Sequence, residues 1–163
     1  MSWPRRLISA AAIALAAAGL DQASKWLMLE VVLNPPESIA LTPFLNLRLG
    51  FNTGVSFGLF QEDSVSRSWT LIAVSVAVMI WLLIWLWRAE QRLVVVALGA
   101  ILGGAAGNII DRMRFGAVFD FLDFHAFGWH WPAFNIADSA IVIGVGLLLL
   151  DGFLPRRGSD DGR

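Results

Sequence analysis

Four long apolar stretches dominate this sequence of 163 residues. They cover residues 7–32, 69–87, 93–110 and 136–154. A helix of about 20 apolar residues crosses the hydrocarbon core of a bilayer, where only helices and closed barrels satisfy their own backbone hydrogen bonds. The sequence therefore predicts an all-α membrane protein with four transmembrane helices in a single domain, residues 1–155, followed by a solvated tail at 156–163.

The composition agrees with a membrane protein and excludes several kinds of site. Charged residues make up 15% of the chain, whereas soluble domains average about 25%. The net charge of −1 gives no indication of a nucleic-acid partner. The absence of cysteine excludes disulfides, thiolate nucleophiles and cysteine-based metal sites. Because His125 and His130 are the only histidines, we expect no metal and no other cofactor.

The basic residues are distributed unevenly about the four stretches. Seven of them share one side: Arg5, Arg6, Arg88, Arg92, Arg156, Arg157 and Arg163. The positive-inside rule makes that side cytoplasmic, so both termini lie inside and residues 33–68 and 111–135 lie outside. The basic start before an apolar run also fits a secretory signal peptide. Since apolar character resumes after Lys25 and no polar domain follows, we favour an uncleaved first span.

Two patterns predict how the segments pack. Gly99, Gly103 and Gly107 place a small residue at every fourth position of the third stretch, which lets a neighbouring helix approach closely. Apolar and polar residues alternate on both sides of "NTG" in "LNLRLGFNTGVSFGLF", residues 45–60. This alternation predicts a small outward-facing β-hairpin with one apolar face between spans one and two. A loop packed on the protein's own helices is the alternative.

Charged residues recur where the spans meet the outward side. Asp21 and Lys25, four residues apart, lie on one helix face, where they either neutralise each other or line a functional cavity. More charges follow the third stretch in "GNIIDRMRFGAVFDFLDF". A charge in the hydrocarbon costs about 2.5–3.5 kcal/mol, so such residues face a cavity, pair, or snorkel to the interface. Snorkelling suits Arg114 and Asp123, and it suits Asp120, between two phenylalanines, less well.

Asn135 and Asp138 open the fourth stretch. An Asn at the N-cap and an acid at the third helical position form a capping box, and capping alone would explain both residues. Asp120, however, is a second isolated carboxylate on the same side. Two carboxylates held together in a poorly solvated place share a proton, and such a pair activates water while protonating a leaving group. The helix end would favour the ionised form of Asp138, which makes Asp120 the carrier of the proton.

Four motifs together resemble the bacterial lipoprotein signal peptidase family, also called signal peptidase II. They are "DQASKW", "NTGVSFGLF", "GGAAGNIIDRMRFGAVFDFLDF" and "FNIADSAI". The resemblance implies an aspartic endopeptidase of the bacterial inner membrane, with its active site on the periplasmic side. Members remove signal peptides from prolipoproteins by cutting before a diacylglyceryl-modified cysteine.

The resemblance also implies roles for individual residues and partners. Asp120 and Asp138 match the catalytic pair. Positions that support the site or hold substrate are matched by Asp21, Lys25, Asn52, Gly54, Asn108, Asp111, Arg112 and Asn135. The implied partners are lipid-modified prolipoproteins, membrane lipids and globomycin-type inhibitors. We expect a monomer, because nothing in the sequence calls for a partner subunit.

Two other functions would use the same polar residues. An ion-coupled transporter would route protons along Asp21, Lys25, Asp111 and Asp138, but no inverted repeat relates the two halves of the chain. A Ser–Lys peptidase would pair Lys25 with Ser24 or Ser139. Neighbouring residues on a helix point about 100° apart, so Ser24 and Lys25 cannot pair.

Overall fold

The structure is a computed structural model that describes residues 3–54 and 64–154. Its long helices are α1 (Trp3–Leu27), α2 (Ser64–Arg88), α3 (Arg92–Phe115) and α4 (Ile136–Phe153). A short π-helix, η1 (Met28–Val32), continues α1. Within the described residues, four helices are long and apolar enough to cross a membrane. The predicted all-α membrane fold is confirmed.

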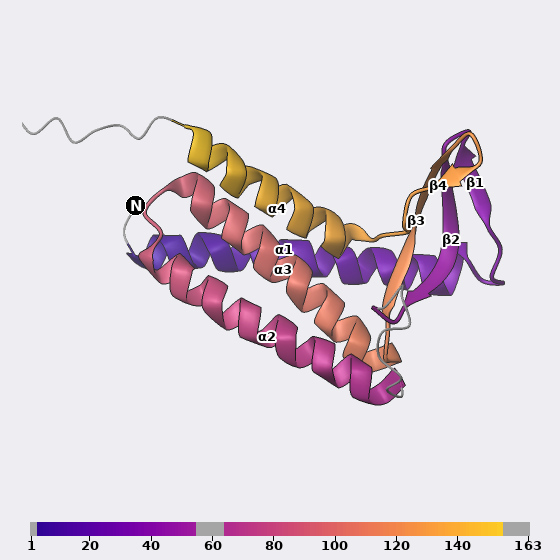
Figure 1. Cartoon of the computed structure of the whole chain (residues 1–163), viewed down its shortest axis with the longest axis horizontal. Helices are drawn as coiled ribbons and strands as arrows, with labels where there is room; N and C mark the ends of the chain where they lie inside the picture. Colours follow the sequence, from indigo (N-terminus) through magenta and orange to yellow (C-terminus); the bar gives the residue numbers. More distant parts are fainter. Residues whose placement is uncertain (1–2, 55–63, 155–163) are drawn as a thin grey trace, which may run out of the picture.

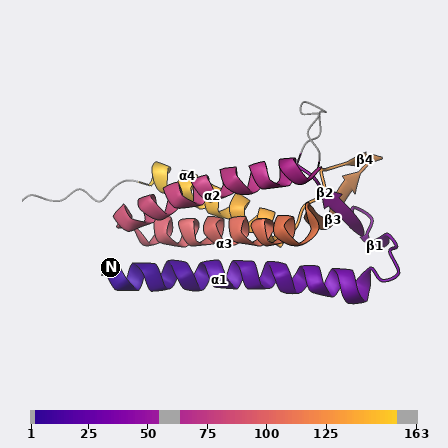
Figure 2. The ribbon, with the colours of Figure 1, turned by 90° about the horizontal axis from the view of Figure 1, so that it is seen from below.

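The helix α3 lies at the centre of the bundle and packs against each of the other three (Figures 1 and 2). Its glycines allow this close packing. The backbone oxygen of Ala10 in α1 lies 2.9 Å from the position that a Cβ on Gly99 would occupy. Gly103 and Gly107 also face α1, and Gly104 approaches α4 equally closely. The predicted close packing along the small residues of this span is confirmed.

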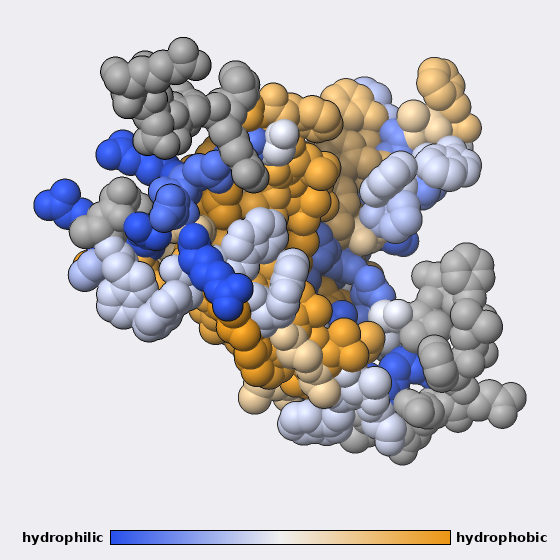
Figure 3. Space-filling model, turned by 60° about the vertical axis from the view of Figure 1, so that its left-hand side comes forward, coloured by the Kyte–Doolittle hydropathy of each residue, from blue (hydrophilic) through white to orange (hydrophobic). Residues whose placement is uncertain are grey.

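The outside of the bundle is covered by apolar side chains. Leu15 in α1, Trp81 in α2 and Val142 in α4 are 75%, 59% and 70% exposed. Figure 3 shows a broad hydrophobic surface over the middle of the molecule. Soluble monomers rarely expose apolar patches of more than a few hundred Å². This surface therefore suits lipid as its surroundings.

A small antiparallel sheet lies across one end of the bundle, which we call the sheet end (Figure 1). Its strands are β1 (Ile39–Thr42), β2 (Leu45–Asn52), β3 (Val118–Ala126) and β4 (Trp129–His130), in that spatial order. The first two strands lie between α1 and α2 in the sequence, and the last two between α3 and α4. The sheet therefore joins two segments that are distant in the chain.

A buried cluster of Leu33, Leu47, Phe119 and Phe121 holds the sheet against the end of α1. Phe119 and Phe121 alternate with Asp120, and successive side chains of a strand point to opposite faces. Asp120 therefore points away from this cluster. Its backbone pairs with Gly50 of β2, so the middle of the sheet fixes its position.

The predicted hairpin and the predicted end of the third span compare with the structure as follows. Strand β2 confirms the first arm of the predicted hairpin and pairs with β1 and β3, whereas the second arm, residues 55–59, lies outside the described residues. The third span was predicted to end at Ile110, but α3 continues to Phe115. It ends there because Gly116 adopts a left-handed conformation, with φ of 72°, and donates its N–H to the carbonyl oxygen of Arg112. Asp111 is consequently a helical residue.

Candidate active site

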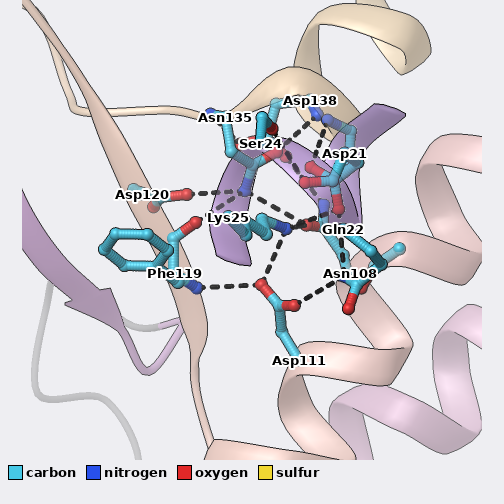
Figure 4. Close-up of polar contacts among 12 residues, drawn as sticks. Asp21, Gln22, Ser24, Lys25, Asn108, Asp111, Phe119, Asp120, Asn135 and Asp138 are labelled. Atoms are coloured by element: carbon cyan, nitrogen blue, oxygen red, sulfur yellow. Dashed lines mark hydrogen bonds and ion pairs between the residues drawn. The ribbon is translucent and has the colours of Figure 1, made fainter. Parts of the chain in front are cut away.

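One residue, Asn135, hydrogen-bonds to both Asp120 and Asp138 (Figure 4). The Nδ2 of Asn135 donates a hydrogen bond of 2.8 Å to Oδ1 of Asp120. Its Oδ1 accepts a 2.9 Å bond from the N–H of Asp138, and its own N–H donates to Oδ2 of Asp138 at 3.3 Å. The predicted capping box at the start of α4 is confirmed. The capping residue therefore also contacts the second carboxylate.

A second amide, from Asn52 at the end of β2, holds Asp120. Its Nδ2 donates to Oδ2 of Asp120 at 3.1 Å. The Oδ1 of Asn52 accepts a 2.8 Å bond from the N–H of Gly54, which has a φ of 85°. Glycine adopts this conformation without steric cost. Gly54 thus orients the amide so that its donor faces the carboxylate.

Asn108 of α3 plays the corresponding part for Asp138. Its Nδ2 donates to Oδ1 of Asp138 at 2.8 Å. Its Oδ1 accepts from Nδ2 of Asn135 at 3.2 Å and lies 3.5 Å from Nζ of Lys25. The two carboxylates and the three amides of Asn52, Asn108 and Asn135 form one hydrogen-bonded network.

A buried ion cluster of Asp21, Lys25 and Asp111 lies next to this network. Nζ of Lys25 lies 2.8 Å from Oδ2 of Asp21 and 2.7 Å from Oδ2 of Asp111, and all three side chains are at most 3% exposed. Asp21 accepts the N–H of Ala137 at 2.9 Å, and Asp111 accepts the N–H of Phe119 at 3.0 Å. The pairing of Asp21 with Lys25 on one helix face is confirmed. The cluster also fastens the start of α4 and of β3 to the spans.

The surroundings of Asp120 favour its protonated form. Burial raises the pKa of Asp120 from 3.8 to about 6. The hydrogen bond from Asn52 lowers this pKa and the negative charge of Asp138 raises it, so the two carboxylates influence each other. Asp120 therefore keeps a proton at pH values where an ordinary aspartate is ionised.

Two clefts reach the site from outside. One, of about 200 Å³, is lined by Arg48, Gly50, Phe51, Asn52, Asp120, Pro132 and Ala133. The other, of about 560 Å³, is lined in part by Phe51, Trp69 and Arg112. The guanidinium of Arg112 interacts electrostatically with Asp138 and Asp120. The smaller cleft opens on Asp120, and the larger one is lined by the positively charged Arg112.

Comparison with known proteins identifies the family. The model of a family described as signal peptidase (SPase) II matches residues 13–154. The chain belongs to this family. It is 50% identical to the lipoprotein signal peptidase of Methylorubrum extorquens over 142 residues, which cover 86% of this chain and 83% of that protein. It is 47% identical to the lipoprotein signal peptidase of Beijerinckia indica over 135 residues, covering 82% and 81%.

Solved structures of bacterial membrane enzymes have the same fold. One is 27% identical with a TM-score of 0.75, covering 94% of this chain and 93% of that one. Another is 29% identical with a TM-score of 0.77, covering 88% and 92%. The family predicted from the four motifs is confirmed, and membership of the signal peptidase II family makes the chain a bacterial membrane peptidase.

Sequence reasoning missed one polar residue at the site of this signal peptidase II family member. Nε2 of Gln22 donates to Oδ1 of Asp111 at 2.9 Å and to Oδ2 of Asp21 at 3.2 Å. A polar side chain within an apolar span, next to Asp21, was the signal that could have identified it.

The interpretation of Asp123 as a snorkelling residue is wrong. Asp123 is 2% exposed and its carboxylate lies 2.9 Å from Nδ1 of His130, 3.4 Å from Nδ2 of Asn46 and 3.7 Å from Nε of Arg48. The register of the sheet brings Asn46 to Asp123, because these two residues pair directly across β2 and β3.

Among the residues that the structure describes, no group of three or more His, Cys, Asp or Glu is arranged to hold a metal.

Proposed function

We propose that the chain is an aspartic endopeptidase that removes signal peptides from diacylglyceryl-modified prolipoproteins, with Asp120 and Asp138 as its catalytic pair. The observation that carries this proposal is the double contact of Asn135, which hydrogen-bonds to both carboxylates. The names of the curated relatives support the substrate class, since both are lipoprotein signal peptidases.

The two carboxylates have different environments, which suits different roles. Asp138 lies at the N-terminus of α4, where the helix dipole favours negative charge. Asp120 is buried and has a pKa raised to about 6 by that burial. Ionised Asp138 is the general base, and protonated Asp120 is the general acid.

The proposed reaction needs only water and these two groups. Asp138 takes a proton from a water molecule while the oxygen of that water attacks the peptide carbonyl carbon. At the same time, Asp120 gives its proton to the carbonyl oxygen. The resulting tetrahedral diol collapses when the C–N bond breaks. Asp138 then donates its proton to the leaving nitrogen, and a diol hydroxyl returns a proton to Asp120. Both carboxyl groups end in their starting states, and no metal or cofactor takes part.

The hydroxyl contacts do not favour a Ser–Lys mechanism. Oγ of Ser24 donates to the carbonyl oxygen of Asp21 at 2.8 Å, and Oγ of Ser139 donates to that of Asn135 at 3.0 Å. Nζ of Lys25 forms ion pairs with the carboxylates of Asp21 and Asp111.

We further propose the location and partners of the enzyme. Arg5, Arg6, Arg88 and Arg92 flank the helix ends opposite the sheet, which the positive-inside rule makes cytoplasmic. Both termini then lie on the cytoplasmic side of the bacterial inner membrane, and the site faces the periplasm. Lipid-modified prolipoproteins and membrane lipids are the natural partners, globomycin-type compounds the expected inhibitors, and the working unit a monomer.

Cleavage of a diacylglyceryl-modified precursor by the purified protein in detergent tests the proposal. The parent should cleave it, whereas Asp120→Asn and Asp138→Asn should not. Asp123→Asn is the matched control, because it makes the same change at another buried acid of β3, and it should retain cleavage. A chelator should leave the parent rate unchanged. Undiminished cleavage by either variant of the pair would reject the mechanism.

A further inference from the structure

The turn between β3 and β4 carries an unusual residue for its geometry. Ala126 pairs with Trp129, so Phe127 and Gly128 form a two-residue hairpin loop. Their φ angles are 52° and 80°. Two-residue loops with positive φ at both positions strongly favour Asn, Asp or Gly, because a Cβ is crowded in this conformation. Phe127 is therefore strained.

Within the part of the chain that the structure describes, no packing around Phe127 compensates for this strain. Phe127 has an exposed fraction of 109%, so its ring projects fully from the turn. Strained residues persist where the surroundings or the function require them. The large apolar side chain at this position therefore points to an apolar medium outside the described part of the chain.

The neighbouring residues extend the apolar surface. Trp129 and Trp131 are 69% and 59% exposed, and their rings lie 6.4 Å apart. A cleft of about 300 Å³ beside them is lined by Phe44, Phe124, His125, Ala126, Trp129 and Trp131. Tryptophan is enriched at membrane–water interfaces, where an apolar ring meets a polar N–H group. We call Phe127, Trp129 and Trp131 the aromatic tip.

The aromatic tip lies close to the membrane-spanning surface. Trp131 precedes Ile136, the first residue of the spanning helix α4, by five positions, and five extended residues reach at most about 18 Å. Figure 1 shows the strands crossing the end of the bundle, with β4 lying to one side, beyond the end of α4. Trp26 and Trp69, 60% and 59% exposed, lie towards the same end on α1 and α2. The tip therefore continues the aromatic belt of the spans.

We propose that the aromatic tip inserts into the headgroup–acyl boundary of the leaflet at the sheet end, with Phe127 as its deepest residue. The partner is the phospholipid surface itself. None of the three side chains is charged, so insertion depends on apolar contact rather than on anionic headgroups. Strand β3 would then be held by α3 at one end and by the bilayer at the other. This second attachment would fix the depth of Asp120 relative to the membrane.

Because the chain contains no cysteine, a single introduced cysteine can carry a nitroxide without background labelling. Phe127→Cys is labelled in the full chain, reconstituted in phosphatidylcholine nanodiscs. Collision rates with oxygen, which concentrates in lipid, and with a water-soluble nickel chelate are then measured. Val142→Cys on the exposed face of α4 gives the lipid reference, and Glu37→Cys, exposed between η1 and β1, gives the aqueous reference.

The ratio of oxygen to nickel collisions at position 127 should exceed that at position 37 several-fold and approach that at 142. A ratio equal to that at 37 would overturn the proposal. Protection from both reagents would overturn it too, since it would indicate a protein contact, and spin–spin broadening between labels would identify a second copy.

A second variant separates lipid insertion from folding of the turn. Phe127→Asn places a residue that tolerates positive φ in the turn, so the hairpin should fold at least as well as in the parent. A nitroxide at Trp131→Cys should nevertheless become more accessible to the nickel chelate in this background. Unchanged accessibility would show that Phe127 does not anchor the tip. Exchange of one third of the lipid for phosphatidylglycerol should leave the ratio at 127 unchanged, and a large increase would contradict apolar insertion.

Discussion

Replacement of Asp120 by asparagine should stabilise the protein at neutral pH and destabilise it at low pH. The pKa of Asp120 is 3.8 as an ordinary aspartate and about 6 in the folded chain, chiefly because of burial. The folded protein therefore binds this proton more tightly than the unfolded chain. Its free energy of unfolding falls as the pH rises through that window, by at most roughly 3 kcal/mol. Asparagine does not titrate and avoids this loss.

A second contribution is the same at every pH. The asparagine oxygen can still accept the bond from Asn135, but its amide then meets the Nδ2 of Asn52, which is also a donor. One lost hydrogen bond costs about 1 kcal/mol. Relative to the parent, Asp120→Asn should be roughly 0.5 kcal/mol less stable at pH 4 and up to about 2 kcal/mol more stable at pH 8.

Thermal unfolding in detergent, followed by circular dichroism from pH 4 to pH 8, measures this effect. The melting temperatures of parent and variant should cross, with roughly 2–4 °C for each kcal/mol. Parallel curves for the two proteins would refute the burial argument, because they would mean that Asp120 titrates alike in the folded and unfolded chains.

Asp123→Asn is a control with the opposite sign. Burial opposes ionisation of Asp123, but hydrogen bonds from His130 and Asn46 outweigh it and lower the pKa of this carboxyl. Its stabilising contribution is therefore present above the unfolded pKa and is lost as the pH falls through the folded pKa. This variant should be less stable than the parent at pH 8, and the deficit should shrink on acidification.

Three further substitutions test the supporting structure. Asn135→Ala removes the side chain that caps α4 and holds Asp120, so it should lower kcat on the order of 100-fold with little change in KM. A change in KM alone would contradict a positioning role. Lys25→Met leaves two buried carboxylates without a cation and should lower the free energy of unfolding by about 3–5 kcal/mol. An unchanged melting temperature would show that the ion pairs of Lys25 do not stabilise the fold. Gly99→Ala should destabilise the protein by about 1–3 kcal/mol, since its Cβ would lie 2.9 Å from the Ala10 carbonyl oxygen. The control Gly146→Ala, whose Cβ would have no neighbouring atom within 4 Å, should be neutral or stabilising. Equal effects of the two substitutions on the melting temperature would refute close packing of α1 on α3.

Local sequence patterns predicted the features that depend on short separations. The spans follow from length and composition, the Asp21–Lys25 pair from spacing on one helix, and the cap of α4 from three residues. Each of these interactions lies within a single helix. Their physical determinants are therefore visible in the sequence itself.

The features that sequence reasoning missed depend on packing between distant segments. The strand β3 is buried on both faces along most of its length, so it lacks the alternation that identifies an exposed strand. Asp123 finds Asn46 across a sheet register, and Asn108 finds Asp138 through the packing of α3 on α4. No local sequence pattern predicts these contacts between distant residues. The double contact of Asn135 was hidden for the same reason.

The order in which the segments occur along the chain has a consequence for biosynthesis. A ribosome delivers Asn52 with the second strand, Asp120 two spans later, and Asn135 with Asp138 only as the last helix emerges. Until that helix is inserted, the nascent chain lacks one carboxylate and the bridging amide. On the proposed mechanism, a nascent chain without α4 would have no proteolytic activity, and it would gain that activity once α4 is inserted.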